Sequence, residues 1–275
     1  MTLTLAQSLK RAQTLGLARI DAQLLHLHAL GRSPHDRAWL LAHDSDALPA
    51  EVQERLESWL QRRLAGEPIA YITGRKEFFG LSLQVDARVL DPRPDTETLV
   101  DWALTLLPAD QALRVLDLGT GSGAVALAIQ HERPNCQVPA VDASANALAV
   151  ASANAQRLAL PVRFVQSDWM ANVSGPFDLI VSNPPYVAEG DPHLAALTHE
   201  PLQALTSGAD GLDDIRQIIA QAPSRLAPGG WLLLEHGWDQ AAAVQDLLRH
   251  AGWVQVQSRQ DLAGTERCTG GQLPG

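Results

Sequence analysis

The chain of 275 residues contains only two cysteines, Cys136 and Cys268, and no apolar run that approaches the roughly 20 residues needed to span a bilayer. Neither cysteine lies in a Cys-x-x-Cys motif, and the nine histidines are scattered rather than spaced as ligands, so we expect inert thiols and no metal site. The first residues also lack the basic region, apolar core and cleavage site of a signal peptide. We therefore expect a globular protein of the cytoplasm without a membrane partner.

Positive charge is scarce as well, because 21 Lys and Arg residues face 31 Asp and Glu residues, for a net charge of −10. Nucleic-acid-binding proteins usually present a basic field, so no nucleic-acid partner is expected, although a local basic patch can exist within an acidic total. The length exceeds that of one typical domain, which predicts two domains, one of them small.

Apolar residues recur at helical spacing from Thr4 to Leu64, which predicts helices throughout this stretch. Breaks at Gly16, at 31–34 and at 48–49 divide the stretch into several short helices. The pattern is typical of a small helical bundle. Such a bundle is either a structural cap or a platform that docks a partner, and the sequence favours neither.

The next stretch, 66–95, changes character and contains alternating apolar residues after Phe78-Phe79-Gly80, which predicts a hairpin that links two domains. Two prolines in segment 91–97 indicate an extended entry into the second domain. Asp95 or Thr96 is then expected to cap the helix that follows.

From Arg114 onward, short apolar runs alternate with helical stretches, which predicts an α/β fold with a parallel sheet covered on both faces. The predicted strands are 115–117, 138–142, 162–166, 177–182 and 231–235. The predicted helices are 124–130, 145–158, 211–226 and 238–251.

A glycine-rich loop, Asp-Leu-Gly-Thr-Gly-Ser-Gly at 117–123, follows the first of these strands and opens a helix. Its glycines permit close approach of a ligand, and the amides at the helix start are expected to bind the carboxylate of an amino-acid-like cofactor. The spacing differs from Gly-x-Gly-x-x-Gly, and the lysine of a phosphate-binding loop is missing, so nicotinamide and triphosphate ligands are disfavoured. The cofactor-binding residues predicted here are Gly119, Thr120, Gly121, Ser122 and Gly123.

Two further carboxylates follow the next two strands. Asp142 lies about 20 residues beyond the glycine loop, where a carboxylate binds ribose hydroxyls in related sites. Asp168 and Trp169 follow the third strand and are predicted to contact the adenine, through the exocyclic amine and an apolar ring surface. Because the carboxyl ends of parallel strands meet at one edge of a sheet, the three loops point at one crevice.

The fourth strand ends in Ser182-Asn183-Pro184-Pro185-Tyr186, the most specific feature of the chain. Two prolines hold the loop rigid, Asn183 offers a carbonyl, and the Pro184 carbonyl can point into the site because the next residue has no amide hydrogen. Together they form two acceptors for one planar NH2 group. Tyr186 is expected to pack against that group.

At this loop the chain resembles the amino methyltransferases that act on planar NH2 groups and, within them, the HemK/PrmC family of release factor glutamine N5-methyltransferases. The segments that carry the resemblance are Gly66-x-Pro68-x-x-Tyr71-Ile72-x-Gly74, Pro92 to Glu97, Asn183 to Tyr186, Glu200-Pro201 with Ala204-Leu205, and Leu234-Glu235-His236-Gly237. The resemblance implies an N-terminal helical substrate-docking domain at 1–68, a hairpin linker at 69–94 and a Rossmann-like methyltransferase domain at 95–275.

The resemblance also implies a reaction. The enzyme would transfer a methyl group from S-adenosyl-L-methionine to the side-chain amide nitrogen of the glutamine in the Gly-Gly-Gln motif of peptide chain release factors. The residues expected to be catalytic are Asn183, Pro184 and Tyr186; those that bind the substrate are Asn183, Pro184, Pro185 and Tyr186; and Asn183 also contacts the cofactor. An adenine N6-methyltransferase acting on nucleic acid is the alternative, and a non-catalytic binding module is a third hypothesis.

The tail departs from the family, which usually closes its sheet with a hydrophobic strand. Here Cys268 is followed by Thr-Gly-Gly-Gln-Leu, and adjacent glycines weaken strand propensity, so the last strand is predicted to be short or frayed. The tail also contains Gly270-Gly271-Gln272, the tripeptide that the family modifies. A chance match is favoured over a pseudosubstrate.

Overall fold

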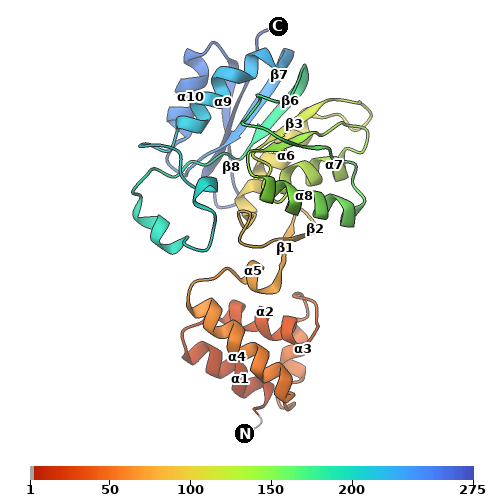
Figure 1. Cartoon of the computed structure of the whole chain (residues 1–275), viewed down its shortest axis with the longest axis vertical. Helices are drawn as coiled ribbons and strands as arrows, with labels where there is room; N and C mark the ends of the chain where they lie inside the picture. Colours follow the sequence, from red (N-terminus) through yellow and green to blue (C-terminus); the bar gives the residue numbers. More distant parts are fainter. Residues whose placement is uncertain (1–2) are drawn as a thin grey trace. The chain divides into compact units, whose positions relative to one another are not determined.

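The computed structural model describes residues 3–275, which divide into two compact units (Figure 1). The helical unit ends at Arg75 and also includes Ala196–His199. The sheet unit comprises Lys76–Ala195 and Glu200–Gly275. Among the described residues, no helix is long and apolar enough to cross a membrane.

The helical unit consists of short helices joined by tight turns: α1 (Leu5–Thr14), α2 (Arg19–Ala29), α3 (Arg37–Ala42), α4 (Ala50–Leu64) and α5 (Ile69–Thr73). Gly16 and Gly31 follow the first two helices with positive φ, a conformation that glycine adopts without strain. The predicted helix breaks are confirmed. The helices enclose one apolar core, whose fully buried members include Leu5, Leu25, Leu27, Leu40 and Leu56.

A hairpin follows α5 and is formed by β1 (Arg75–Phe78) and β2 (Leu81–Gln84). Phe79 and Gly80, the two residues between the strands, both have positive φ, as the twist of a two-residue hairpin turn requires. Beyond the hairpin, a 3-10 helix (η1, Pro94–Thr96) leads into α6 (Glu97–Leu106).

The prediction that Asp95 or Thr96 caps α6 is wrong, because no side chain caps the start of this helix. Asp95 instead lies 3.2 Å from the guanidinium of Arg267. Thr96 is buried, and its hydroxyl accepts a hydrogen bond from the side chain of Asn183. The physical reason is that both side chains find partners elsewhere in the sheet unit, at residues far away in the sequence.

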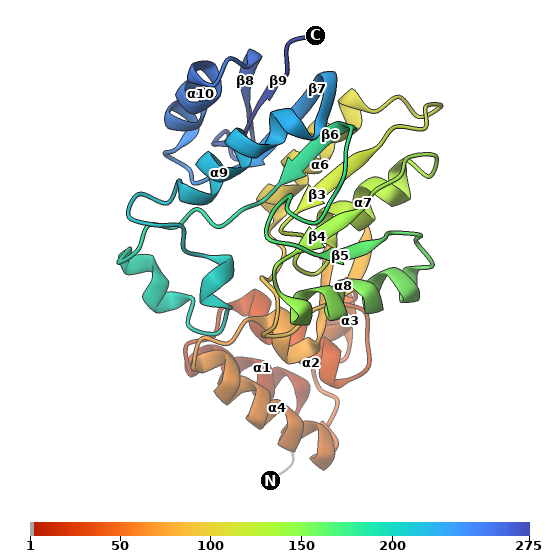
Figure 2. The ribbon, with the colours of Figure 1, turned by 45° about the horizontal axis from the view of Figure 1, so that its top comes forward.

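The sheet has seven strands in the order β5-β4-β3-β6-β7-β9-β8 (Figure 2). Strands β3 to β7 are parallel, and β9 is antiparallel to both of its neighbours. The strands are β3 (Val115–Leu118), β4 (Ala140–Asp142), β5 (Phe164–Gln166), β6 (Phe177–Ser182), β7 (Leu226–Glu235), β8 (Val254–Gln260) and β9 (Glu266–Gln272). The predicted Rossmann-like α/β fold is confirmed.

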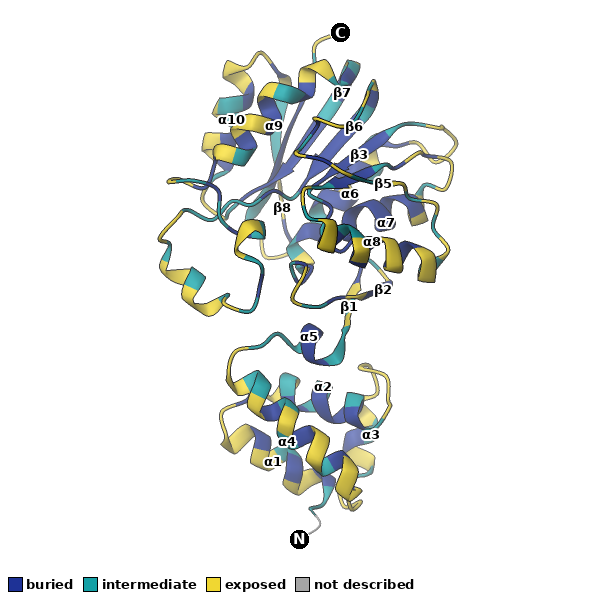
Figure 3. Cartoon of the chain, in the orientation of Figure 1, coloured by how far each residue is buried: buried dark blue, intermediate teal, exposed yellow. Residues whose placement is uncertain are grey.

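Helices cover the sheet and bury its apolar side chains, as Figure 3 shows by the dark strands and the exposed outer faces of α9 and α10. Leu232 and Leu234 of β7 share a core cluster with α9 (Asp213–Gln221) and α10 (Ala241–His250). On the other face of β7, Trp231 meets Trp102 of α6, with ring centroids 6.3 Å apart. The remaining helices are α7 (Ala124–Glu132) and α8 (Ala145–Leu158), and short 3-10 turns occur at Pro192–Ala196, Leu202–Ala204 and Ala222–Ser224.

The prediction of a short or frayed last strand is also wrong. Strand β9 runs for seven residues between β7 and β8 and is bonded to both. A side-chain carbon at Gly270 would lie 2.5 Å from Leu233 and 2.7 Å from the Leu232 carbonyl, so the absence of a side chain is what allows this strand to fit. The tripeptide 270–272 is therefore part of the sheet, and the Gln272 amide donates to the Gly229 carbonyl at 2.8 Å.

Candidate active site

A cavity of about 270 Å³ lies in the sheet unit, at the carboxyl ends of the parallel strands. Three loops that follow β3, β4 and β5 meet there with the loop that follows β6, as the sequence predicts. The predicted residues that line the cavity are Gly119, Thr120, Gly121, Ser122, Asp142, Asp168, Trp169, Asn183 and Pro185. Gly123, Pro184 and Tyr186 do not line it.

The glycine loop is held in place by its own backbone amides. Thr120 N donates to the Val141 carbonyl at 2.9 Å, and Gly123 N donates to the Thr120 carbonyl at 2.8 Å. Gly121 N donates to the Asp142 carboxylate at 2.9 Å. The expectation that these amides are free to bind a ligand carboxylate is therefore wrong for the three residues, since each N–H already has a partner within the protein.

Gly123 has a packing role in the loop. Its φ is +85°, and a side-chain carbon there would lie 3.0 Å from Leu127 and 3.3 Å from Ala151. Glycine at this position lets α7 and α8 approach each other closely behind the cavity.

The carboxylate of Asp142 joins the glycine loop to the strand that follows it. One oxygen accepts from Gly121 N and the other accepts from Ser144 N at 2.8 Å. Burial raises the pKa of Asp142, and these two backbone hydrogen bonds partly offset that rise. Each carboxylate oxygen has a further lone pair, so Asp142 can still accept from hydroxyl groups of a ligand in the cavity.

Asp117, at the third position of β3, also lines the cavity and is buried. One of its oxygens accepts from the Thr120 hydroxyl at 2.6 Å and from Ala126 N at 3.2 Å. Burial raises the pKa of Asp117 to about 7, and the neighbouring Asp142 adds to the rise. A positively charged ligand would favour the ionised form of this carboxyl group.

We expect cofactor affinity to fall as the pH falls, because Asp117 must lose its proton when a cation binds beside it. With a free-protein pKa of about 7, the dissociation constant of S-adenosylmethionine should rise up to about tenfold from about pH 8 to about pH 6. Titration calorimetry at both pH values measures this change. The Asp117→Asn variant should show a flatter dependence, and equal dependence in both proteins would contradict the assignment.

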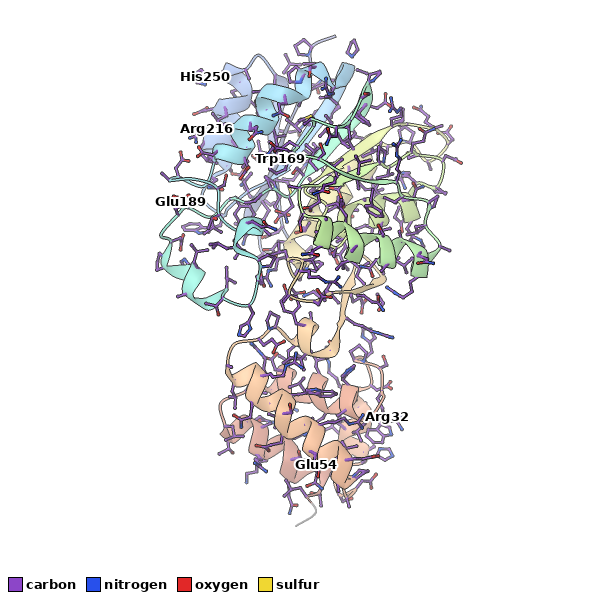
Figure 4. The ribbon with its side chains drawn as sticks, viewed as in Figure 1. Arg32, Glu54, Trp169, Glu189, Arg216 and His250 are labelled. Carbon is purple, nitrogen blue, oxygen red and sulfur yellow. The ribbon has the colours of Figure 1, made fainter. Side chains whose placement is uncertain are left out.

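Trp169 lines the cavity next to the glycine loop. Its backbone has a φ of +43°, which is unusual for a residue with a side chain. A side-chain carbon at Gly119 would meet the Trp169 ring at 3.5 Å, so the ring lies directly beside the loop. Trp169, which is labelled in Figure 4, belongs to the sheet unit and is partly buried, whereas Arg216 on α9 is exposed.

The loop that follows β6 is fastened to the sheet unit at several points. Ser182 Oγ donates to the Leu118 carbonyl at 2.8 Å at the start of the loop. At its end, Tyr186 N donates to the Leu205 carbonyl at 3.2 Å, and Gln240 Nε2 donates to the Tyr186 carbonyl at 3.1 Å. The loop is thus fixed on both sides of Asn183.

The amide of Asn183 is oriented by its neighbours. Its Nδ2 donates to Thr96 Oγ1 at 3.1 Å. The carboxylate of Glu235, the buried last residue of β7, is close enough to Thr96 and Asn183 for their side chains to lower its pKa. Because the NH2 side of the amide is used in this way, the Oδ1 atom is the group that Asn183 offers to a ligand in the cavity.

The phenol of Tyr186 lies among charged groups rather than in the cavity. Burial raises the pKa of Tyr186, the nearby Glu235 raises it further, and Arg267 and Arg93 act in the opposite direction. Tyr186 therefore stays neutral at physiological pH. The hydroxyl group cannot serve as a base in this state.

Comparisons with known proteins agree with this geometry. The PrmC N-terminal domain profile matches residues 3–74, and the methyltransferase small domain profile matches residues 96–257. The release factor glutamine methyltransferase of Bordetella pertussis is 51% identical over 262 residues, covering 94% of this chain and 96% of that protein. The protein of the same name from Xylella fastidiosa is 49% identical over 272 residues, covering 98% of each. This chain belongs to the release factor glutamine methyltransferase family.

Solved structures share the fold of this family member at low sequence identity. A methyltransferase from Pyrococcus furiosus has a TM-score of 0.56 and 20% identity, covering 79% of this chain and 99% of that chain. A 16S rRNA N2 G1207 methyltransferase from T. Thermophilus, solved with AdoMet and guanosine, has a TM-score of 0.54 and 19% identity, covering 72% and 49%. These likenesses concern the fold alone.

The sequence prediction gave no site role to several residues of this family member's site, among them Thr96, Asp117, Asp214 and Glu235. Asp117 has a local signal, because it opens the glycine motif directly after a strand. Thr96 and Glu235 lie 87 and 52 positions from Asn183 along the chain (183 − 96 and 235 − 183). Only the order of the strands brings them together. Among residues 3–275, no cluster of three or more His, Cys, Asp or Glu side chains could hold a metal ion.

Proposed function

We propose that this protein transfers a methyl group from S-adenosyl-L-methionine to the side-chain amide nitrogen of a glutamine in peptide chain release factors, within their Gly-Gly-Gln motif. The observation that carries the proposal is the oriented amide of Asn183 at the edge of the cavity. Its Nδ2 is held by Thr96, so its Oδ1 is available to accept a hydrogen bond from a planar NH2 group.

The cavity fits the cofactor. S-adenosylmethionine carries a sulfonium and an ammonium group, and four carboxylates line the cavity: Asp117, Asp142, Asp168 and Asp214. Asp142 retains lone pairs for ribose hydroxyls, and the Trp169 ring offers an apolar surface for a flat base. When bound, the cofactor supplies an electrophilic methyl group.

The residues of the target loop act on the nucleophile. The lone pair of a carboxamide nitrogen is delocalised, so this nitrogen attacks poorly unless it is aligned and its N–H bonds are held. Asn183 Oδ1 and the Pro184 carbonyl accept these two N–H bonds, and both hydrogen bonds strengthen as the nitrogen gains positive character. Alignment of the two reactants can contribute up to about 7–11 kcal/mol.

A base strong enough to deprotonate the amide before attack is not required. The N–C bond forms as the C–S bond to the transferred methyl group breaks, which leaves S-adenosyl-L-homocysteine. The methylated amide nitrogen is then strongly acidic and loses its proton to water. The neutral Tyr186 and the acceptors of Asn183 and Pro184 therefore suffice for the step. Tyr186 does not line the cavity, and its backbone hydrogen bonds fasten the loop that carries Asn183.

We further propose that the helical unit docks the release factor and that the protein works in the cytoplasm, where its substrates take part in translation. Arg32 stacks on the ring of Trp39 at 3.9 Å, and that ring stacks on His43 with centroids 4.0 Å apart. Leu41, close by in sequence, is 68% exposed. A surface with an exposed leucine beside a cation and aromatic rings suits contact with another protein.

The proposed function is tested by incubating the protein with S-adenosylmethionine and a bacterial release factor, then analysing the digested release factor by mass spectrometry. We expect the Gly-Gly-Gln peptide to gain the mass of one methyl group, with fragmentation placing it on the glutamine side chain. Whole release factor should be methylated faster than a short peptide if the helical unit contributes to docking.

Duplex DNA and structured RNA are tested as alternative methyl acceptors in parallel reactions. Transfer of radiolabelled methyl to either nucleic acid, without transfer to the release factor, would show an adenine N6-methyltransferase instead. Cofactor binding without transfer to any of these substrates would show a non-catalytic binding module. Either result would overturn the proposed function.

A further inference from the structure

Glu235 is a buried carboxylate at the candidate active site that the mechanism above does not use. It ends β7, and it is paired in the sheet with Cys268 of β9. Its side chain is 1% exposed. Burying a carboxylate costs free energy unless the group is paired and hydrogen-bonded. A buried, incompletely paired carboxylate is therefore a candidate for a functional role.

The partners of Glu235 all belong to the target side of the site. The side chains of Thr96 and Asn183 lie close to its carboxylate and lower its pKa, and Asn183 Nδ2 donates to Thr96 Oγ1 at 3.1 Å. The second oxygen, Oε2, is buried and has no hydrogen-bond partner among the described residues. The carboxylate thus faces the NH2 side of the Asn183 amide and the hydroxyl of Thr96.

We propose that Glu235 is a positioning residue: together with Thr96 it fixes the NH2 group of Asn183, so that Asn183 Oδ1 faces the target amide. This proposal rests on the proposed function and deepens it. A carboxylate accepts hydrogen bonds and cannot donate them. Its presence therefore permits one orientation of the Asn183 amide and excludes the flipped one.

The orientation matters because an asparagine amide is nearly symmetrical in shape. If the amide were flipped, its NH2 group would meet the NH2 group of the substrate, and two donors would face each other. A negative carboxylate beside the NH2 group also shifts electron density toward Oδ1, because neighbouring polar groups polarise one another. Oδ1 then becomes a stronger acceptor for the nitrogen that gains charge during transfer.

Glu235 changes its charge near neutral pH. Burial raises the pKa of Glu235 to about 7, the hydrogen bonds from Thr96 and Asn183 oppose the rise, and Asp95 adds to it while Arg267 lowers it. The other titratable groups that face Glu235 are Tyr186 and Cys268, whose pKa values burial also raises. Both of these stay neutral at pH 7, so Asp95 and Arg267 are the charges that bias Glu235.

The Glu235→Gln variant separates positioning from a structural role. In the wild type, turnover at saturating cofactor should rise with pH through about 7, where Glu235 ionises. In Glu235→Gln, turnover should fall about tenfold at about pH 8, and the rise with pH should disappear, because a neutral amide accepts more weakly and its own NH2 group competes. The dissociation constant of the cofactor should change only a few-fold.

Thermal stability should not fall with turnover in Glu235→Gln. The folded pKa of Glu235 is raised from 4.5 to about 7, so the folded state holds a proton that the unfolded state releases between these values. The free energy of unfolding therefore falls as the pH rises from about 4.5 to about 7, because the buried Glu235 must become charged in the folded state. At about pH 8 the Gln variant should have an equal or higher Tm than the wild type. A residue with a merely structural role would lose stability and activity together.

Glu200→Gln is the matched control. Glu200 is also buried, its Oε2 also lacks a hydrogen-bond partner among the described residues, and burial raises its pKa. Its partner is Arg93, at 2.6 Å, instead of Asn183. Glu200→Gln should keep the pH dependence of the wild type.

A measurement without substrate keeps the inference separate from the proposed function. In protein labelled with ¹⁵N-asparagine, the side-chain NH2 signal of Asn183 should move with pH about a midpoint near 7 in the wild type and stay constant in Glu235→Gln. Thr96→Val removes the hydrogen bond from Asn183 Nδ2 to Thr96 Oγ1 and should also shift this signal. If Glu235→Gln does not fold, the Thr96→Val variant tests the inference in its place. An Asn183 signal that is indifferent to both changes, or wild-type turnover with an unchanged pH profile, would overturn the inference even in a protein that methylates its release factor.

Discussion

Replacing Asn183 with alanine should lower turnover about 10²–10³-fold, because one of two acceptors for the target NH2 group is lost and its hydrogen bond strengthens in the transition state. The backbone fold of the loop should persist, since Ser182 and Tyr186 fasten it on both sides. Cofactor affinity should stay within a few-fold, because the carboxylates and Trp169 are untouched. Steady-state methylation of a release factor and calorimetric titration of the cofactor measure the two quantities.

Asn135→Ala is the control for this experiment. Asn135 is an exposed asparagine whose amide donates to the Ala109 carbonyl at 3.2 Å, and it does not line the cavity. Its replacement should leave turnover unchanged. Near-normal turnover in Asn183→Ala would falsify the role assigned to Asn183, and a large loss of cofactor affinity would make Asn183 chiefly a cofactor ligand.

Replacing Gly270 with alanine should destabilise the protein by about 3 kcal/mol, at the upper end of what overpacking usually costs. The new methyl group would lie 2.5 Å from Leu233, 2.7 Å from the Leu232 carbonyl and 2.9 Å from the Trp102 ring. Leu232 belongs to the neighbouring strand, so its backbone cannot retreat without breaking the β7–β9 pairing. Tm should fall by roughly 6–12 °C, as measured by calorimetry.

Gly271→Ala is a matched comparison because it makes the same change at the next position of the same strand, on its other face. There the nearest atoms would be the side chains of Trp253 at 3.1 Å and Val256 at 3.3 Å. These contacts can relax by small movements, so the loss should be about 1 kcal/mol or less. Equal losses for the two variants would mean that strand propensity, rather than packing, sets the cost at Gly270.

The parts of the site that the sequence predicts are those in which a motif and its function lie in one loop. The glycine loop, Asp142, Trp169 and the Asn183 loop each follow an apolar run, and a parallel sheet brings the ends of such runs to one edge. The amide partners within the glycine loop could not be predicted in this way. Whether an N–H is free depends on how closely β4 approaches, and local sequence does not specify that distance.

The two strands that the sequence predicts incorrectly, β8 and β9, also depend on contacts between residues far apart in the chain. Strand β8, which is absent from the prediction, alternates Val254, Val256 and Ser258 with polar residues, and such a pattern can belong to an exposed edge as easily as to a loop. Adjacent glycines suggested a weak last strand, yet close packing against β7 requires them there. In each case pairing with a neighbouring strand overrides the local propensity.

The hydrogen bond from the NH2 group of Asn183 to Thr96 affects which side chains the site can accept. Because Nδ2 is held by Thr96, the target loop presents lone pairs and no donor from this side chain. Glutamine satisfies such a site, whereas the glutamate formed when glutamine deamidates brings no N–H and carries a negative charge toward a cavity lined by Asp117, Asp142 and Asp168. Under the proposed function, the same hydrogen bond that orients Asn183 therefore disfavours a glutamate side chain at the target position.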